Sequence, residues 1–208
     1  MSDAPPDPAA SPQTSPAAAA PTWADADRAA AFESWLARVA PAHGLRPASL
    51  RVASADASFR RYFRLDTEDG ATRIVMDAPP AHENSAPFVR VAGLMRDAGL
   101  NVPQVLDWGR PATANWRGLQ EAPPAQGFML LTDLGARTMM DEIDRAHPEA
   151  NRPRYLQAVE ALLQWQQASR PGVLPPYDAA LLRRELALFP DWYLARHRGV
   201  TVEGALRE

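Results

Sequence analysis

The sequence predicts an α+β fold, in which a small antiparallel sheet with one inserted helix precedes a region that is entirely helical. The first observation is a change in the spacing of apolar residues near residue 50, from about four to about two, which marks a change from helix to strand. The second is the return to helical spacing alone after residue 131. A chain of 208 residues has room for one domain or one and a half.

The first predicted element follows a tail in which proline and alanine fill 13 of the first 22 positions. We expect residues 1–22 to be disordered, because they hold too little apolar surface to offset the entropy of ordering them. A helix is expected over 24–40, with a capping-box-like start at Thr22 to Asp25 and an end at Pro41. Its buried face should carry Phe32, Trp35, Leu36 and Val39.

Three strands should follow this helix, at 50–54, 59–65 and 72–76. The turn at 68–70 ends in Gly70 and should join the second and third strands as an antiparallel hairpin. The second strand has two alternating faces, with Phe59, Arg61, Phe63 and Leu65 on one and Arg60, Tyr62 and Arg64 on the other.

A second helix is expected over 84–98, closed by Gly99. Segment 102–106 should be an edge strand, because its proline has no N–H to give to a neighbouring strand. Segment 127–131 is apolar throughout and should be a central strand, and a polar, proline-rich insertion at 108–126 separates the two. The buried side of the helix should hold Phe88, Val91, Leu94 and Met95.

Two longer helices complete the predicted elements. The first covers 154–169, and the second begins with Asp178 as its N-cap and ends at Pro190. Their apolar residues are Tyr155, Val159, Leu162 and Leu163 in the first, and Leu181, Leu182, Leu186 and Phe189 in the second.

The composition excludes several kinds of chemistry. All 22 basic residues are arginine, so a P-loop lysine, a Schiff-base lysine and a lysine general base are excluded. The lack of cysteine excludes disulfides and cysteine-ligated metal sites. A net charge of −3, with arginines interspersed among acids, argues against a nucleic-acid partner. No stretch reaches the ~20 apolar residues of a membrane span, so we expect a cytoplasmic protein with no membrane partner.

Four segments in a fixed order carry a family resemblance. They are Ala55 to Leu65 (ADASFRRYFRL), Ile74 to Pro80 (IVMDAPP), Gly99 to Pro103 (GLNVP) and Leu130 to Gly135 (LLTDLG). Together they resemble the aminoglycoside phosphotransferase and choline kinase superfamily. Within it the chain is most similar to the bacterial sugar kinases that phosphorylate N-acetylmuramate and N-acetylglucosamine at the anomeric hydroxyl. The segments 174–178 and 185–192 are also similar to that subgroup, so the resemblance spans about residues 30–200.

This resemblance implies a protein kinase-like fold. Residues 24–135 would be the nucleotide-binding N-lobe with a five-stranded antiparallel sheet, and 136–208 would be the first helices of a substrate-binding C-lobe. ATP and Mg²⁺ would be the cofactors, and an amino sugar of cell-wall recycling would be the acceptor. N-acetylmuramate, N-acetylglucosamine, an aminoglycoside and choline all remain open as acceptors, because the loops that select them belong to the C-lobe.

The loop made by Ala55, Asp56, Ala57, Ser58 and Phe59 is the candidate for covering nucleotide phosphates. Small side chains allow phosphates to approach backbone N–H groups closely. The chain has no G-x-G sequence, and on the residues alone an ordinary hairpin turn is the other interpretation. The resemblance favours the phosphate-binding interpretation.

The residues Thr132, Asp133 and Leu134 follow the central strand, where related kinases join their two lobes. By resemblance, the carbonyl of Thr132 and the N–H of Leu134 would bind the adenine ring. The alternative from the residues alone is a strand-ending turn with Gly135 at positive φ.

One departure from the family pattern concerns the third strand, which has Met76-Asp77 where related kinases place a lysine that binds the phosphates. Arginine can take this role, because its planar fork binds two oxygens. The local candidates are Arg61, Arg64 and Arg73, each of which is otherwise a solvated strand arginine. Glu83 could be the helix glutamate of the fold, or simply an acid that favours the start of a helix.

The catalytic segment of the superfamily, an H-x-D sequence followed by asparagine and by a D-F element, is absent from the sequence. No catalytic or metal-binding residue is therefore assigned. We expect this chain to be an amino-terminal fragment that is inactive alone, with an exposed helical face that drives association. The alternative is a non-catalytic module that binds a nucleotide or a partner protein.

Overall fold

The structure, a computed structural model, describes residues 20–55, 59–108 and 126–203. The chain divides into two compact units, Met1–Gln167 and Ala168–Glu208. Most of the expected tail and insertion lies outside the described residues. In the part of the chain that is described, no helix is long and apolar enough to cross a membrane.

The larger unit is built on a five-stranded antiparallel sheet, which confirms the predicted fold class. Its strands are β1 (Arg51–Ala55), β2 (Arg61–Asp66), β3 (Thr72–Asp77), β4 (Val105–Asp107) and β5 (Phe128–Thr132). The order β1-β2-β3-β5-β4 places β4 at the edge and β5 inside the sheet, as the sequence predicts. Gly70, with a φ of 81°, makes the turn of the predicted β2–β3 hairpin.

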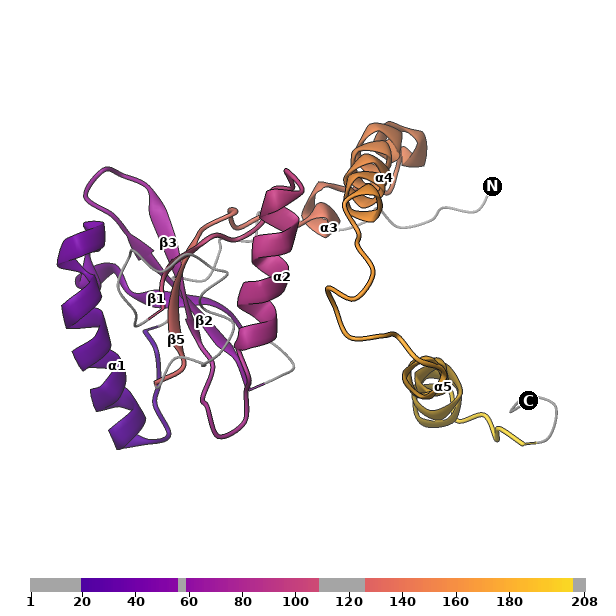
Figure 1. The fold of residues 1–208 in the computed structure, drawn as a ribbon, viewed down its shortest axis with the longest axis horizontal. Helices are drawn as coiled ribbons and strands as arrows, with labels where there is room; N and C mark the ends of the chain where they lie inside the picture. Colours follow the sequence, from indigo (N-terminus) through magenta and orange to yellow (C-terminus); the bar gives the residue numbers. More distant parts are fainter. Residues whose placement is uncertain (1–19, 56–58, 109–125, 204–208) are drawn as a thin grey trace, which may run out of the picture. The chain divides into compact units, whose positions relative to one another are not determined.

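One face of the sheet is covered by α1 (Ala26–Val39), as Figure 1 shows. The helix begins at Asp25, whose side chain accepts hydrogen bonds from the N–H groups of Asp27 and Arg28. The expected capping-box start at Thr22 is therefore wrong, because Thr22 lies a full turn too early to reach these N–H groups. The predicted buried residues Phe32, Trp35, Leu36 and Val39 pack against Phe63, Leu65, Val75, Phe128 and Leu130 of the sheet.

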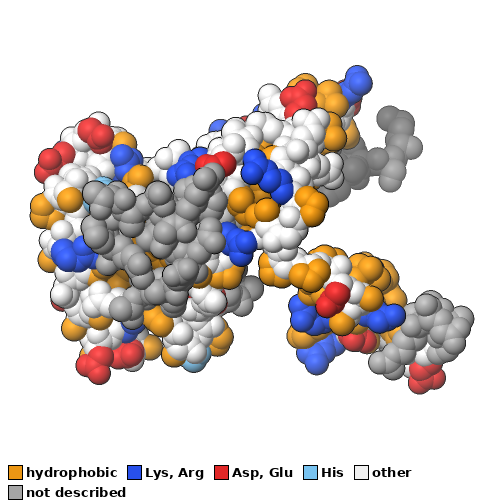
Figure 2. Space-filling model, viewed as in Figure 1, with side chains coloured by type: hydrophobic (Ala, Val, Ile, Leu, Met, Phe, Trp, Pro, Cys, Tyr) orange, Lys and Arg blue, Asp and Glu red, His pale blue; other side chains and the backbone are white. Residues whose placement is uncertain are grey.

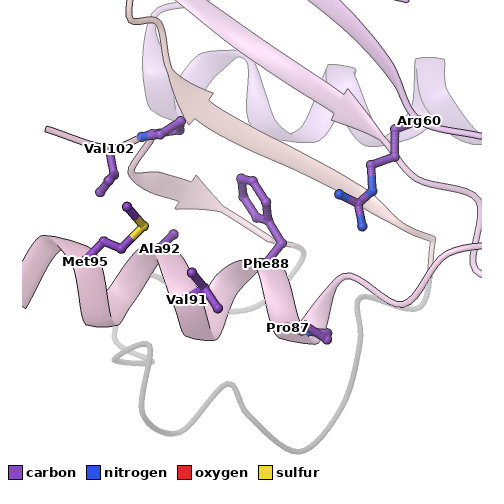
Figure 3. Close-up of a pocket in the computed structure, with 8 residues that line it drawn as sticks. Arg60, Pro87, Phe88, Val91, Ala92, Met95 and Val102 are labelled. Atoms are coloured by element: carbon purple, nitrogen blue, oxygen red, sulfur yellow. The ribbon is translucent and has the colours of Figure 1, made fainter. Parts of the chain in front are cut away.

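The opposite face of the sheet carries α2 (Ala86–Asp97) (Figure 1). Its expected buried face is wrong, because the structure buries Val89 and Gly93. Apolar residues surround nearly the whole helix, so their spacing alone could not select the side that packs on the sheet. Phe88, Val91, Leu94 and Met95 are only half buried. The first two and Met95 line an open cavity of about 350 Å³, which Figure 3 shows.

The helical part of the larger unit contains α3 (Met139–Glu142) and α4 (Arg152–Gln167). Gln164 links α4 to α2, since its Nε2 donates to the carbonyl oxygen of Ala98 at 2.7 Å. That carbonyl belongs to the end of α2, where the helix itself supplies no donor. The apolar side chains of α4 are about half exposed: Tyr155, Leu156, Val159, Leu162 and Leu163.

The smaller unit contains α5 (Ala179–Leu188), which begins at Asp178 as predicted. The Asp178 side chain accepts a hydrogen bond from the N–H of Leu181 at 2.8 Å. The α-helix ends at Leu188, just before Pro190 as predicted, but a π-helix, Phe189–His197, continues the chain. The wider π-helical turn changes the hydrogen-bond pattern where the proline removes a donor. Hydrophobic side chains remain exposed on this unit (Figure 2): Leu182, Leu186, Leu188, Phe189, Trp192 and Tyr193.

Candidate functional site

A cavity of about 390 Å³ lies on the α2 side of the sheet and extends to the segment that leaves β5. Ser54 of β1 and Tyr62 of β2 line it together with Ile74 of β3. Its far end is formed by residues 131–136. A concave site with apolar walls and few polar groups is the usual form of a small-molecule site.

The structure brings some of the predicted site residues together at this cavity. Arg64, Thr132, Asp133 and Leu134 all line it, and Ala55 directly follows Ser54 in β1. Asp56, Ala57 and Ser58 lie outside the described residues.

Three other candidates lie elsewhere. Phe59 is 63% exposed and stacks on the ring of His82, with centroids 4.5 Å apart. Arg61 binds Asp77 on the α1 side of the sheet, and Arg73 donates to the carbonyl oxygen of Thr72. None of the three lines the cavity.

The crossing segment, residues 132–135, is held in place through Asp133. Arg64 binds both carboxylate oxygens of Asp133, with Nε at 2.5 Å from Oδ2 and Nη2 at 3.1 Å from Oδ1. The hydroxyl of Thr72 donates to Oδ2 at 2.7 Å, and the N–H of Gly135 donates to Oδ1 at 2.8 Å. Arg64 also donates to the carbonyl of Gly135. Because these bonds join β2, β3 and the crossing segment, its backbone has a fixed conformation beside the cavity.

These contacts change the acidity of Asp133. Burial is the largest single influence and raises the pKa, but the hydrogen bonds from Arg64, Thr72 and Gly135 together outweigh it. The pKa of Asp133 is therefore lowered from 3.8 to about 2. A carboxylate whose pKa is lowered by folding stabilises the folded state at a pH above its pKa in the unfolded chain. This stabilisation is lost as the pH falls through the pKa of the folded state.

We expect Asp133→Asn to lower the free energy of unfolding by roughly 2 kcal/mol at pH 7. The difference from wild type should shrink between pH 4 and pH 2, where the wild-type carboxylate takes up its proton. Urea unfolding of both proteins across this range measures the difference. Thr72→Val, which removes one hydrogen bond, should move this loss to higher pH. A difference that does not depend on pH would contradict the assignment.

Asp77 is held by two arginines at the end of β3, where the family resemblance would place a cation. Its side chain is fully buried and binds Arg28 and Arg61, both of which lie on the α1 side of the sheet. The preceding residue, Met76, is fully buried on the α2 side, where it packs with Val89. On the side of the sheet where the cavity lies, the end of β3 therefore carries the apolar residue Met76 and no cation.

The ion pair between Arg60 and Glu83 was not anticipated from the sequence. Nε of Arg60 lies 3.0 Å from Oε2 of Glu83, and the side chains are only 25% and 12% exposed. Phe59 and Arg60 are adjacent in sequence, as are His82 and Glu83. The Phe59–His82 stacking and the Arg60–Glu83 ion pair therefore join the same two short segments. The only available signal was the alternation that puts Arg60 on the same strand face as Tyr62 and Arg64.

Comparison with protein families identifies the chain. The model described as the phosphotransferase enzyme family matches residues 49–206. This chain belongs to the phosphotransferase enzyme family. The match begins just before β1 and includes the cavity, the crossing segment and the helices that follow, so it reaches into both compact units but leaves out α1.

Three curated relatives of this phosphotransferase bear the name N-acetylmuramate/N-acetylglucosamine kinase. The Pseudomonas aeruginosa protein is 48% identical over 76% of this chain and 41% of its own length. The Pseudomonas putida protein is 41% identical over 76% of this chain and 41% of its own length. The Neisseria meningitidis protein is 38% identical over 81% of this chain and 45% of its own length. The chain thus spans less than half the length of these relatives.

A metal site does not form within the described part of this phosphotransferase. Across residues 20–55, 59–108 and 126–203, no three His, Cys, Asp or Glu side chains gather in a position to hold an ion. These residues therefore do not fit the magnesium ligation that phosphoryl transfer uses. Asp133, which lines the cavity, is bound to Arg64.

Proposed function

We propose that this chain is the nucleotide-binding part of an ATP-dependent sugar kinase. The proposed reaction transfers the γ-phosphate of ATP to a hydroxyl of an amino sugar, such as the anomeric hydroxyl of N-acetylmuramate or N-acetylglucosamine. Membership of the phosphotransferase family supports the reaction, and the names of three relatives support the acceptor. In this proposal residues 24–135 form the N-lobe, and 136–208 begin a substrate-binding C-lobe.

The observation that carries the proposal is the crossing segment, which lines a cavity while Asp133 holds its backbone. Adenine requires one hydrogen-bond acceptor and one donor on extended backbone, between apolar surfaces. The carbonyl of Thr132 and the N–H of Leu134 would supply this pair. The cavity offers Ile74 and Leu131 as apolar surfaces beside it.

The phosphate groups are proposed to lie toward the loop at 55–59. Ser54, which lines the cavity, supports this placement because it directly precedes the loop. Mg²⁺ enters the proposal as the ion that accompanies the phosphates of ATP, and no residue of this chain is assigned to it. No catalytic residue is assigned either, since the chain has no H-x-D sequence.

Leu134→Pro is expected to weaken ATP binding roughly 5- to 150-fold, because proline removes the N–H proposed to bind adenine. An unsatisfied buried partner of a lost hydrogen bond between uncharged groups costs about 1–3 kcal/mol. Leu134→Ala is the matched control, and it should bind ATP as wild type does, since it keeps the N–H and the native side chain is 52% exposed. Isothermal titration calorimetry with ATP measures the affinities.

The outcomes of this titration separate the proposal from its alternatives. Failure of the wild-type chain to bind ATP would contradict nucleotide binding altogether. Equal affinities for the proline and alanine variants would contradict the assignment of Leu134. We expect the chain to bind ATP without transferring phosphate to N-acetylmuramate or N-acetylglucosamine. ³¹P NMR measures the transfer.

The exposed apolar side chains of α4, α5 and the π-helix belong to the same proposal. Exposed patches of this kind are typical of surfaces that contact other protein. We infer that they pack either on further polypeptide of a longer protein or on a second copy of this chain.

A further inference from the structure

We propose that Tyr62 stacks on the base of the nucleotide and makes the site selective for purines. This inference rests on the proposed nucleotide site, in which Thr132 and Leu134 bind the edge of adenine. It assigns the residue that contacts the face of the same ring. The sequence indicated only that Tyr62 shares a strand face with Arg60 and Arg64.

The sheet places Tyr62 on the cavity side of β2, close to the crossing segment. Tyr62 and Arg64 both line the 390 Å³ cavity, because alternate residues of a strand share one face. Arg64 pairs with Ile74 of β3, and Ile74 pairs with Leu131 of β5. This row of the sheet therefore ends directly before Thr132, where the crossing segment begins. A base that is hydrogen-bonded to the crossing segment would extend along this row toward β2, where Tyr62 is the next side chain on the same face.

Small residues of β1 leave room beside Tyr62. Ser54 is the direct cross-strand partner of Tyr62, and the pairing of β1 with β2 shifts by one residue between Val52 and Ser54. Such β-bulges redirect side chains and are frequent next to binding sites. Ala53 and Ser54, although consecutive, both line the cavity. Neither side chain is large enough to cover an aromatic ring, and Tyr62 stays only partly buried.

Tyr62 is also the aromatic residue that belongs to this cavity alone. Within the described residues, the aromatic side chains that line the cavity are Tyr62 and Phe88. Phe88 belongs to α2 and also lines the neighbouring cavity of about 350 Å³ (Figure 3), which Tyr62 does not.

The contacts of the Tyr62 side chain indicate that its ring, not its hydroxyl, serves the fold. The ring packs beside the apolar cluster that contains Met76 and Leu131. The hydroxyl makes no hydrogen bond with any residue that the structure describes. An aromatic ring stacks on any base, and the larger ring system of a purine gives the larger contact.

The first test measures the binding of nucleotides to variants of Tyr62. Tyr62→Leu removes the ring, and we expect the affinities for ATP and for adenosine to fall by the same factor, about fivefold or more. Tyr62→Phe restores the ring and should recover both affinities. The preference for ATP over CTP should shrink in Tyr62→Leu, because the pyrimidine loses the smaller contact. Tyr155→Leu is the matched control, since Tyr155 is 53% exposed and lines neither cavity.

NMR of the wild-type chain gives a second test that does not depend on the folding of a variant. In a deuterated chain with protonated tyrosine rings, H2 or H8 of bound ATP should show a nuclear Overhauser effect to a tyrosine ring. Tyr62→Phe should abolish this signal and identify the residue. If wild type binds ATP but shows no such signal, or if Tyr62→Leu binds ATP equally well or loses affinity equally for ATP and CTP, the inference is wrong. If wild type binds neither ATP nor adenosine, the proposed function itself fails.

Discussion

Replacing Asp77 by asparagine is expected to lower the free energy of unfolding of the larger unit by roughly 3–5 kcal/mol. The Asp77 side chain has no exposure to solvent, and each of its oxygens accepts two hydrogen bonds from one arginine. Asparagine keeps the shape but loses the charge, and its amide group would direct N–H donors at a guanidinium. Two cations, Arg28 and Arg61, would then lack the anion that compensates them.

The effect should extend to all the segments that meet at this network. Arg28 also donates to the carbonyl of Gln126 and lies 3.8 Å from the centroid of the Phe128 ring. Arg61 donates to the carbonyl of Thr22 and lies 4.2 Å from the ring of Trp23. The network thus fastens α1 and the segment before it to β2, β3 and β5. We expect α1 to loosen first, with a change in tryptophan fluorescence from Trp23 and Trp35.

Asp66→Asn is the matched control for this experiment. Asp66 binds Arg51 at 2.8 Å, but the two side chains are 28% and 43% exposed, so their loss should cost less than about 1 kcal/mol. Chemical denaturation of both variants measures the two effects. Similar costs for Asp77→Asn and Asp66→Asn would show that burial does not set the strength of the Asp77 network.

Local sequence signals predicted the elements of this fold well. Gly70 marked the β2–β3 turn, and Asp178 marked the start of α5. The edge strand lies two residues after Pro103, so the predicted strand at 102–106 started too early. Each of these signals depends on residues within a few positions of one another, since backbone conformation is decided locally. The side of α2 that packs on the sheet was missed because it depends on tertiary contacts.

The polar contacts of the site could not be predicted in the same way. Arg64 meets Asp133 across 69 positions, and Arg28 meets Asp77 across 49. With 22 arginines and 25 acids in the chain, composition cannot select these partners. Family resemblance singled out Thr132 to Leu134 within the crossing segment, whereas the side chains that hold this segment, such as Thr72, became evident only from the fold.

Gly127→Ala is expected to destabilise the larger unit by roughly 2–5 kcal/mol, through two effects that act together. Gly127 has a φ of 70°, a conformation that costs an L-residue about 1–2 kcal/mol. A Cβ atom at this position would lie 2.0 Å from the carbonyl oxygen of Ala78 and 2.9 Å from Cδ of Pro80. The first of these contacts is with backbone, so the chain itself must move.

This movement would disturb two strands of the proposed nucleotide site. The Ala78 N–H donates to the carbonyl of Gly127 at 2.9 Å and holds the end of β3 beside the start of β5. Both strands also line the proposed nucleotide site, through Ile74 of β3 and Leu131 of β5. We therefore expect Gly127→Ala to weaken ATP binding as well as stability, although Gly127 lines neither cavity.

Gly70→Ala separates the clash at Gly127 from the cost of the backbone conformation. Gly70 has a similar φ of 81°, but no atom lies within 4 Å of the Cβ position. Its substitution should cost only the conformational part, about 1–2 kcal/mol, and should leave ATP binding unchanged. Thermal and urea unfolding of the two variants, with ATP titration of each, measure both effects. Equal losses of stability at the two glycines would contradict the predicted clash. They would show that the backbone at 78–80 moves to accommodate the added methyl group at little cost.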